Sequence, residues 1–330
     1  MYTNRSYMKK PDPASVDIAD CPADTISDIA FNLENSAMAV SSWDATLSLY
    51  TFSFMPSFGS AQPFRREKVF PLPAPALSTA FFGSTVVAGC VTGALVCFDM
   101  NGNQNLIQAH SAGIKAIKNY NNQFLITGSF DSTIKFWDLK SSQPIYSISL
   151  PGKVYAMSLS GSLLCVACSS KAVLLYDINN LNAPSTYATR FNYGIRSVAM
   201  SSDLDTFVAG GLEAKIEVFS KTMDAKKFCV RSHRDNSRLY SVNVLHFYPL
   251  DAGVIVSGGA DGSLVWFDKH NRMKIQTFSY TEPITAAQFT ADGRYFVFAT
   301  GEDWSKGYVA DSPRPSLKFL DAKNISGLNK

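Results

Sequence analysis

The stretch Gly128-Ser-Phe-Asp-Ser-Thr-Ile-Lys-Phe-Trp-Asp138 decides the fold of this chain. Small residues open it, an Asp stands in a short turn, and a β-rich run leads to an aromatic residue and a second Asp. The same order of residue types returns at residues 41–50 and 258–267, and weaker copies end at Phe98, Tyr176 and Phe219. A unit that recurs in this way predicts an architecture of repeated structural copies.

The spacing of the copies identifies the repeat. Aligned on their turns, they follow one another at intervals of 39 to 48 residues, which fits the period of roughly 40–45 residues of a four-stranded propeller blade. The turn positions are Asp44, Thr92, Asp131, Ser170, Glu213, Asp261 and Asp303. Six positions further on stand Tyr50, Phe98, Trp137, Tyr176, Phe219 and Phe267, whereas the seventh copy has Val309. Apolar and polar residues alternate before each turn, as strands require. We therefore expect an all-β fold, a seven-bladed WD-repeat β-propeller.

A ring of blades leaves no long exposed edge strand once its last blade is completed. We expect residues 15–19 to supply a strand beside residues 316–320 of the last blade, so that the propeller spans residues 15–322. Residues 1–14 are then a flexible N-terminal arm, and residues 323–330 are a C-terminal tail.

The most complete blade, residues 108–150, contains His110, Thr127, Asp131 and Trp137 at the spacing of the structural tetrad of WD repeats. We expect Asp131 to accept a hydrogen bond from the His110 ring, and Thr127 to join His110 to the Trp137 indole. A His-Asp-Thr set is also compatible with a catalytic relay. The structural interpretation is favoured because the set lies inside a blade and lacks an exposed nucleophile.

Composition limits the possible functions. The formal charge is +3, with 30 basic against 27 acidic residues, so a basic site must be a local patch. No apolar run approaches the roughly 18 residues of a membrane span, and the start lacks a signal-peptide pattern. Cys165 and Cys168 have the spacing of a zinc or redox pair, but further ligands are missing and the segment is a predicted buried strand, which favours two core cysteines. We expect no metal, no cofactor and no catalysis.

Two loops of adjacent blades are unusual. The first, residues 226–240, contains Lys226, Lys227, Arg231, His233, Arg234 and Arg238. It is either a solvated loop, with His233 in a second tetrad, or a basic binding site with candidate RNA contacts at Lys226, Lys227, Arg231 and Arg238. The second loop, residues 301–307, places Trp304 in a tight turn. A Trp there either packs locally or serves as an anchor for a partner.

At these residues the chain resembles the WD-repeat RNA-export factors of the nuclear pore, the Rae/Gle type. Ser232-His-Arg234, Leu239-Tyr-Ser-Val-Asn243, Ser257-Gly-Gly-Ala-Asp-Gly262 and Trp266-Phe-Asp-Lys269 carry the resemblance. Asp303-Trp-Ser-Lys-Gly307 is its most specific part, because the related mitotic-checkpoint adaptors of the Bub type typically lack the Trp-Ser-Lys element. The resemblance covers roughly residues 15–322.

The resemblance implies a non-enzymatic scaffold that binds a Gle-binding segment of a Phe-Gly nucleoporin during mRNA export. Arg234 would then pair with a glutamate of that segment, with His233 beside it. Trp304 and Lys306 would form a neighbouring pocket and basic spot, where RNA also competes, and Phe247 would line the same region. The chain would be a monomer or heterodimer in the nucleus and at the nuclear pore, with a cytoplasmic pool.

The same resemblance implies an alternative, a spindle-checkpoint adaptor that binds checkpoint kinases through the same face. Direct RNA binding is a third hypothesis, and we expect it to be weak or to need a partner because the net charge is small. The chain also departs from the family. The segment 234–240 is shorter than in animal members, and Cys168-Ser-Ser-Lys171 stands where the turn is usually acidic or rich in Gly.

Overall fold

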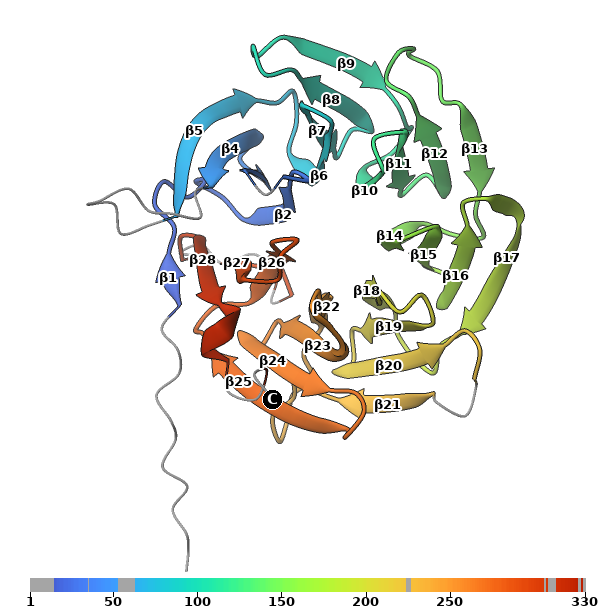
Figure 1. The fold of residues 1–330 in the computed structure, drawn as a ribbon, viewed down its shortest axis with the longest axis vertical. Helices are drawn as coiled ribbons and strands as arrows, with labels where there is room; N and C mark the ends of the chain where they lie inside the picture. The colour runs from blue at the N-terminus through green and yellow to red at the C-terminus, as the bar shows by residue number, and fades with distance from the viewer. Residues whose placement is uncertain are drawn as a thin grey trace, which may run out of the picture.

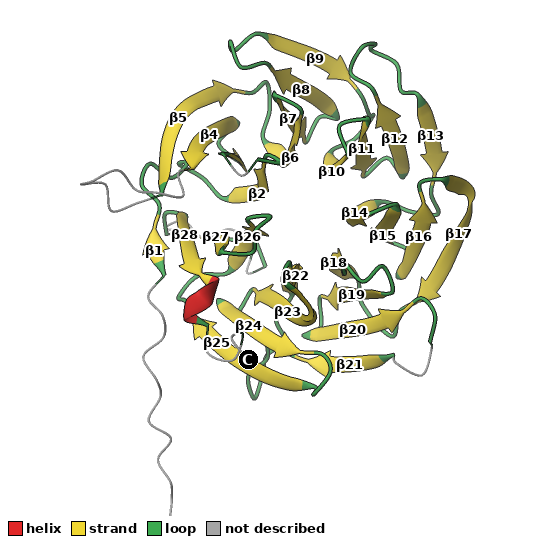
Figure 2. Ribbon diagram, viewed as in Figure 1, coloured by secondary structure: helices red, strands yellow, loops and turns green. Residues whose placement is uncertain are grey.

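In a computed structural model of the chain, the structure describes residues 15–34, 36–52, 63–223, 227–305, 307, 313–325 and 328. The strands of this part form seven four-stranded antiparallel sheets. Figure 1 shows the sheets following one another around a ring in chain order, and Figure 2 shows that strands and loops make up nearly all of it. The predicted all-β, seven-bladed propeller is confirmed.

Each blade takes its strands from the centre outward. Blade 1 comprises β2 (Ile26–Phe31), β3 (Ala37–Ser42), β4 (Thr46–Phe52) and β5 (Phe64–Pro71). Blade 2 comprises β6 (Ala76–Phe82), β7 (Thr85–Cys90), β8 (Ala94–Phe98) and β9 (Gln104–Gln108). Blade 3 comprises β10 (Ile114–Tyr120), β11 (Phe124–Ser129), β12 (Thr133–Trp137) and β13 (Tyr146–Ser149). Blade 4 comprises β14 (Val154–Ser160), β15 (Leu163–Cys168), β16 (Ala172–Asp177) and β17 (Asn180–Ala188).

The remaining blades continue the pattern. Blade 5 comprises β18 (Ile195–Met200), β19 (Thr206–Gly211), β20 (Lys215–Ser220) and β21 (Phe228–Arg231). Blade 6 comprises β22 (Val242–Tyr248), β23 (Asp251–Gly259), β24 (Ser263–Asp268) and β25 (Met273–Ser279). Blade 7 comprises β26 (Ile284–Phe289), β27 (Tyr295–Thr300), β28 (Ser316–Asp321) and β1 (Val16–Asp17), and a short 3-10 turn, Ala322–Asn324, follows β28.

The hydrophobic core lies between the blades. Among the described residues, buried apolar side chains form seven clusters, and each cluster joins two neighbouring sheets. The recurring aromatic residue of the third strand always packs toward the preceding blade: Tyr50, Phe98, Trp137, Tyr176, Phe219 and Phe267. This packing explains why six copies keep an aromatic residue at one position, since its burial stabilises the interface between blades.

The first and the last strand of the described chain pair in blade 7. Strand β1 pairs antiparallel with β28, where Val16 faces Phe319, and the Ile18 amide donates to the Leu317 carbonyl at 2.7 Å. Ile18 is buried in the cluster between blades 7 and 1, and Lys318 forms an ion pair with Asp17. In Figure 1 the blue strand β1 lies beside the red strand β28. The first and last segments of the ring therefore hold each other in place.

The CxxC pair is a pair of core thiols, as predicted. Cys165 and Cys168 lie in β15, and both are free and buried. Cys165 packs into the cluster between blades 4 and 5, whereas Cys168 packs into the cluster between blades 3 and 4. Residues three apart in a strand point to opposite faces, which accounts for this separation.

Candidate functional site

One face of the ring collects two kinds of loop, and we call it the upper face. In every blade the chain leaves the second strand at this face, and it enters the first, innermost strand from the same face. The amide of the residue that follows the second strand donates to a carbonyl of the loop before the first strand. The donors are Trp43, Val91, Phe130, Ser169, Leu212, Ala260 and Gly301, at 2.9 to 3.0 Å. These bonds place the turn after the second strand and the loop before the first strand at the same end of every blade.

The turns share a backbone conformation. In six blades the residue after the turn position has a left-handed backbone: Ala45, Gly93, Ser132, Lys171, Ala214 and Gly262, with φ between 58° and 84°. Two of these six residues are glycine, which adopts this conformation without strain, and the others are small or unbranched at Cβ. The sequence alignment of the first six turns therefore corresponds to one repeated geometry.

The seventh turn departs from this geometry. Gly301 makes the bond to the preceding loop, and the Trp304 amide donates to Glu302 Oε1 at 2.9 Å, so Glu302 occupies the turn position and not Asp303. The left-handed residue comes later, at Trp304, with φ of 62°. The third strand begins only at Ser316, and the longer turn explains why the aromatic spacing failed in this copy. Val309 lies outside the described residues.

The Trp304 side chain is 51% exposed on the upper face. A bulky residue with a left-handed backbone costs roughly 1–2 kcal/mol, and strained residues of this kind cluster at functional sites. The sequence left open whether this Trp packs locally or serves as an anchor. The exposure and the strained backbone of Trp304 favour the interpretation that its ring is a partner anchor over the interpretation that it packs locally.

Arg234 stands on a braced turn in the loop before β22. A bridge pairs Arg234 with Leu239, and the Tyr240 amide donates to the His233 carbonyl at 3.0 Å. The Asp235 carboxylate accepts from the amides of Ser237 and Arg238, both at 2.8 Å, and from the Tyr240 hydroxyl at 3.0 Å. These hydrogen bonds hold the pKa of Asp235 below its ordinary value. Asp235 is therefore occupied within its own turn and does not neutralise Arg234, which is exposed.

The two unusual loops are tied together through Asn243. Its Nδ2 atom donates to Asp303 Oδ2 at 2.9 Å and to the Ile284 carbonyl at 3.0 Å, so it joins the start of β22 to blade 7. The Ser241 hydroxyl donates to Asn243 Oδ1 at 2.6 Å and fixes the amide. Arg234 and Trp304 therefore belong to loops of adjoining blades, and Asn243 bonds the strand that follows the Arg234 loop to the turn of Trp304. Ser241 and Asn243 belong to the motif that carries the family resemblance, but the sequence does not reveal their bridging role, because a polar residue at the start of an innermost strand carries no signal of its partner.

His233 has a different position from the one predicted for a partner contact. Its side chain is fully buried, with Nδ1 2.9 Å from Asp261 Oδ1 and Nε2 2.8 Å from Ser257 Oγ. This is a second tetrad-like network, in which Ser257 replaces Thr and Phe267 replaces Trp. A partner does not reach the ring. His233 supports the loop that presents Arg234.

Phe247 is also placed elsewhere. Arg234 precedes the start of β22, whereas Phe247 is the next-to-last residue of that strand. At about 3.3 Å per residue, the five steps from Val242 to Phe247 span roughly 17 Å. Phe247 is 9% exposed, packs between blades 5 and 6, and lies under the Lys269 ammonium at 5.6 Å. Its prediction as part of the Arg234 region is wrong, because the direction of the strand carries it toward the opposite face.

The basic candidates divide into three groups. Lys226 and Lys306 lie outside the described residues. Lys227 is engaged locally, since its ammonium lies 4.6 Å from the Phe219 ring and donates to the Ala188 carbonyl at 3.3 Å. Arg231, at the end of β21, and Arg238, in the braced turn, are exposed. Only part of the basic loop is therefore free to meet an anion.

The tetrad of blade 3 is a connected hydrogen-bond network. Trp137 Nε1 donates to Thr127 Oγ1 at 2.8 Å, and Thr127 Oγ1 lies 2.7 Å from His110 Nε2. His110 Nδ1 lies 2.9 Å from Asp131 Oδ2. The order fits a neutral His110 that accepts from Thr127 and donates to Asp131. Burial lowers the pKa of His110, against the opposing effect of Asp131. The network is buried and structural in its geometry.

The described residues contain no group of three or more His, Cys, Asp or Glu side chains arranged to hold a metal ion. No helix in the described part of the chain is long and apolar enough to cross a membrane.

The chain is similar in sequence to a known repeat family and to several characterised proteins. Residues 102–138 match the WD domain, G-beta repeat family. A poly(A)+ RNA export protein of Schizosaccharomyces pombe is 30% identical over 92% of this chain and 89% of its own. The WD40 repeat protein poxJ of Penicillium oxalicum is 29% identical over 92% of both chains. The spindle assembly checkpoint protein bub3 of Schizosaccharomyces pombe is 27% identical over 84% of this chain and 88% of its own.

Proposed function

The chain belongs to the family of WD-repeat RNA-export factors of the Rae/Gle type, and on that premise we propose that it acts in mRNA export as a non-enzymatic scaffold. Its ligand is a Gle-binding segment of a Phe-Gly nucleoporin, which lies across the upper face of blades 6 and 7. It works in the nucleus and at the nuclear pore, with a cytoplasmic pool. The observation that supports this proposal best is the exposed Arg234 on a hydrogen-bonded turn, followed by a strand that Asn243 bonds to the turn of exposed Trp304.

Arg234 suits the recognition of a glutamate. Its guanidinium is planar and offers paired N–H donors that match a carboxylate. The braced turn around Asp235 holds the Arg234 backbone in place before the ligand arrives, which reduces the conformational entropy lost on binding. Exposed Leu239, which is bridged to Arg234, provides apolar surface close to this charge, and exposed Trp304 adds apolar surface on the adjoining blade.

The test is a calorimetric titration of the full chain with a synthetic Gle-binding segment of a Phe-Gly nucleoporin. Arg234→Ala should cost about 2 kcal/mol or more, a loss of at least roughly thirtyfold in affinity, because it leaves a desolvated glutamate unpaired. Arg234→Lys should recover only part of this loss, since a lysine cannot form the paired bonds. Arg65→Ala on the outermost strand of blade 1 is the matched control, because its side chain is 82% exposed and lies on another blade.

Two outcomes would count against the proposal. Binding by Arg234→Ala within twofold of the unmodified chain would remove the glutamate-pairing role. Preference for a checkpoint-kinase segment over the nucleoporin segment would favour the alternative function, a spindle-checkpoint adaptor. The observation that favours this alternative is the similarity to spindle assembly and mitotic checkpoint proteins, which extends over most of the chain.

A further inference from the structure

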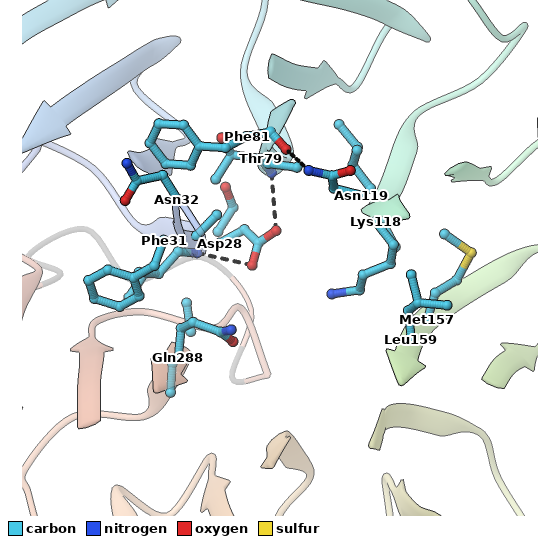
Figure 3. A pocket seen from close by; sticks show the side chains of 18 of the residues that line it. Asp28, Phe31, Asn32, Thr79, Phe81, Lys118, Asn119, Met157, Leu159 and Gln288 are labelled. Atoms are coloured by element: carbon cyan, nitrogen blue, oxygen red, sulfur yellow. Dashed lines mark hydrogen bonds between the residues drawn. The ribbon is translucent and has the colours of Figure 1, made fainter. Parts of the chain in front are cut away.

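The centre of the ring contains a cavity of about 770 Å³. The innermost strands of the blades line it, and their side chains alternate between this cavity and the interfaces between blades. Figure 3 shows Lys118 extending into the space between Asp28, Gln288 and Met157. The cavity is distinct from the Arg234 turn, which does not line it.

Three cationic side chains face this cavity. Lys115 and Lys118 both come from β10, and Arg196 comes from β18, so that they flank blade 4. Lys115 and Lys118 are three residues apart and lie at different levels along β10. Lys115 stands at a register shift between Ile114 and Ala116, and this irregularity interrupts the alternation of the strand, so that both residues line the cavity. Within the described part of the chain, none of the three forms a hydrogen bond or ion pair that would neutralise it.

Among the described residues that line the cavity, two are carboxylates, Asp28 and Glu34, against three cations. Asp28 accepts from the backbone amides of Ile29 at 3.0 Å and Thr79 at 3.1 Å. At the upper rim Asp303 accepts from Asn243 and from the Ser305 amide. Glu34 also lines the cavity and is exposed to solvent. The deep part of the cavity therefore has an excess of positive charge.

The pKa directions of the groups in the cavity agree with a site that a bound anion would stabilise. Burial, together with repulsion by Arg196 and Lys118, lowers the pKa of Lys115 to about 8, against the attraction of Asp28. Burial also lowers the pKa of Arg196. His246, on the opposite wall, has its pKa lowered to about 4 by burial and by Lys118, so it is neutral near pH 7. A bound anion would relieve the repulsion between the cations.

We propose that the central cavity binds a small polyphosphorylated anion, held at one depth by Lys115 and Arg196 and at another by Lys118. The two depths favour an elongated anion with several phosphate groups over a single phosphate. The site does not include the Arg234 turn, and its test does not depend on the proposed peptide function, although Asn243 both lines the cavity and bonds Asp303 of the Trp304 turn.

The experiment is a calorimetric titration of the full chain with inorganic tripolyphosphate at low ionic strength and pH 7. The double variant Lys115→Gln/Lys118→Gln should bind at least tenfold more weakly. The control Lys140→Gln/Lys274→Gln removes the same charge from exposed positions outside the cavity and should stay within twofold of the unmodified chain. Arg196→Gln removes a cavity cation from a different strand and should also weaken tripolyphosphate binding. Arg234→Ala, which lies outside the cavity, should leave the tripolyphosphate affinity unchanged.

Thermal unfolding supplies a second readout. Tripolyphosphate should raise the Tm of the unmodified chain and of the control, but not that of Lys115→Gln/Lys118→Gln. Without ligand, the stability of that variant sets the baseline for this comparison, because the substitutions remove both the repulsion among the cations and the attraction of the two lysines to buried Asp28. No binding by the unmodified chain, or equal losses in the cavity variant and the control, would overturn the proposal.

Discussion

At the scale of single residues, Trp304 combines a strained backbone with an exposed ring. An Ala or a Gly at this position removes the ring equally, but only Gly adopts the left-handed conformation without strain. We expect Trp304→Gly to be more stable than Trp304→Ala by about 1 kcal/mol in urea denaturation. Both variants should lose affinity for the nucleoporin segment by the same factor, about tenfold or more.

This pair of variants separates the fold from the function. Equal stability of the Ala and Gly variants would show that the turn relaxes and that the strain is not maintained. Unchanged peptide affinity in both variants would show that Trp304 is not an anchor. A single Trp304→Ala variant cannot distinguish these cases.

The hydrogen-bond partners of a residue could be predicted from the sequence where those partners recur in every blade. They could not be predicted for residues in loops that occur once. The spacing of His110, Thr127, Asp131 and Trp137 follows from the blade itself, so their hydrogen bonds could be predicted. His233 has the same neighbours, Asp261 and Ser257. The sequence left both interpretations of His233 open, because an imidazole in a basic loop resembles a binding residue as much as a buried one.

At the scale of strands, the closing contact of the ring depends on a very short element. Ile18 follows β1, is 3% exposed and packs between blades 7 and 1. Ile18→Ala should lower the free energy of unfolding by about 2–4 kcal/mol, because it leaves a cavity at the closure. Val16→Ala is the matched control: Val16 lies in β1 with 38% exposure, and this variant should cost less than about 1 kcal/mol.

Urea denaturation measures both variants, and limited proteolysis shows where the chain opens. If the closure holds the ring together, Ile18→Ala should become more susceptible to cleavage near residues 15–25. Equal stabilities of Ile18→Ala and Val16→Ala would mean that β1 adds little to the ring.

Strand positions could be predicted where both the turn and the aromatic residue recur. The last blade shows the limit, because its turn is longer and its third strand starts at Ser316. Counting six positions from Asp303 therefore reaches Val309, not the strand. Phe247 shows another limit. The motif containing it is close to Arg234 in sequence, but β22 runs from one face of the ring to the other. The residue types of a strand do not indicate at which face of the ring a given residue lies.

At the scale of the whole molecule, the charge is nearly balanced, with 30 basic and 27 acidic residues. Part of the positive charge faces the central cavity, and Lys227 is engaged with Phe219. Among the described residues of the basic loop, residues 227–240, the exposed cations are Arg231, Arg234 and Arg238. A surface of this kind offers few contacts to a nucleic-acid backbone.

Single-stranded RNA should therefore bind the isolated chain weakly, with an affinity that falls only gently with salt. Each phosphate neutralised on a single strand contributes about −0.7 to the slope of log K against log salt concentration, so three arginines give a slope of about −2. Fluorescence anisotropy with a labelled oligonucleotide over a range of salt concentrations measures it. Arg231→Gln/Arg238→Gln should make the slope shallower, whereas Lys140→Gln/Lys274→Gln should not. A slope near zero would exclude direct RNA binding. A slope much steeper than −2 would require cations beyond these three arginines, and it would show that the propeller binds RNA without a partner to complete the surface.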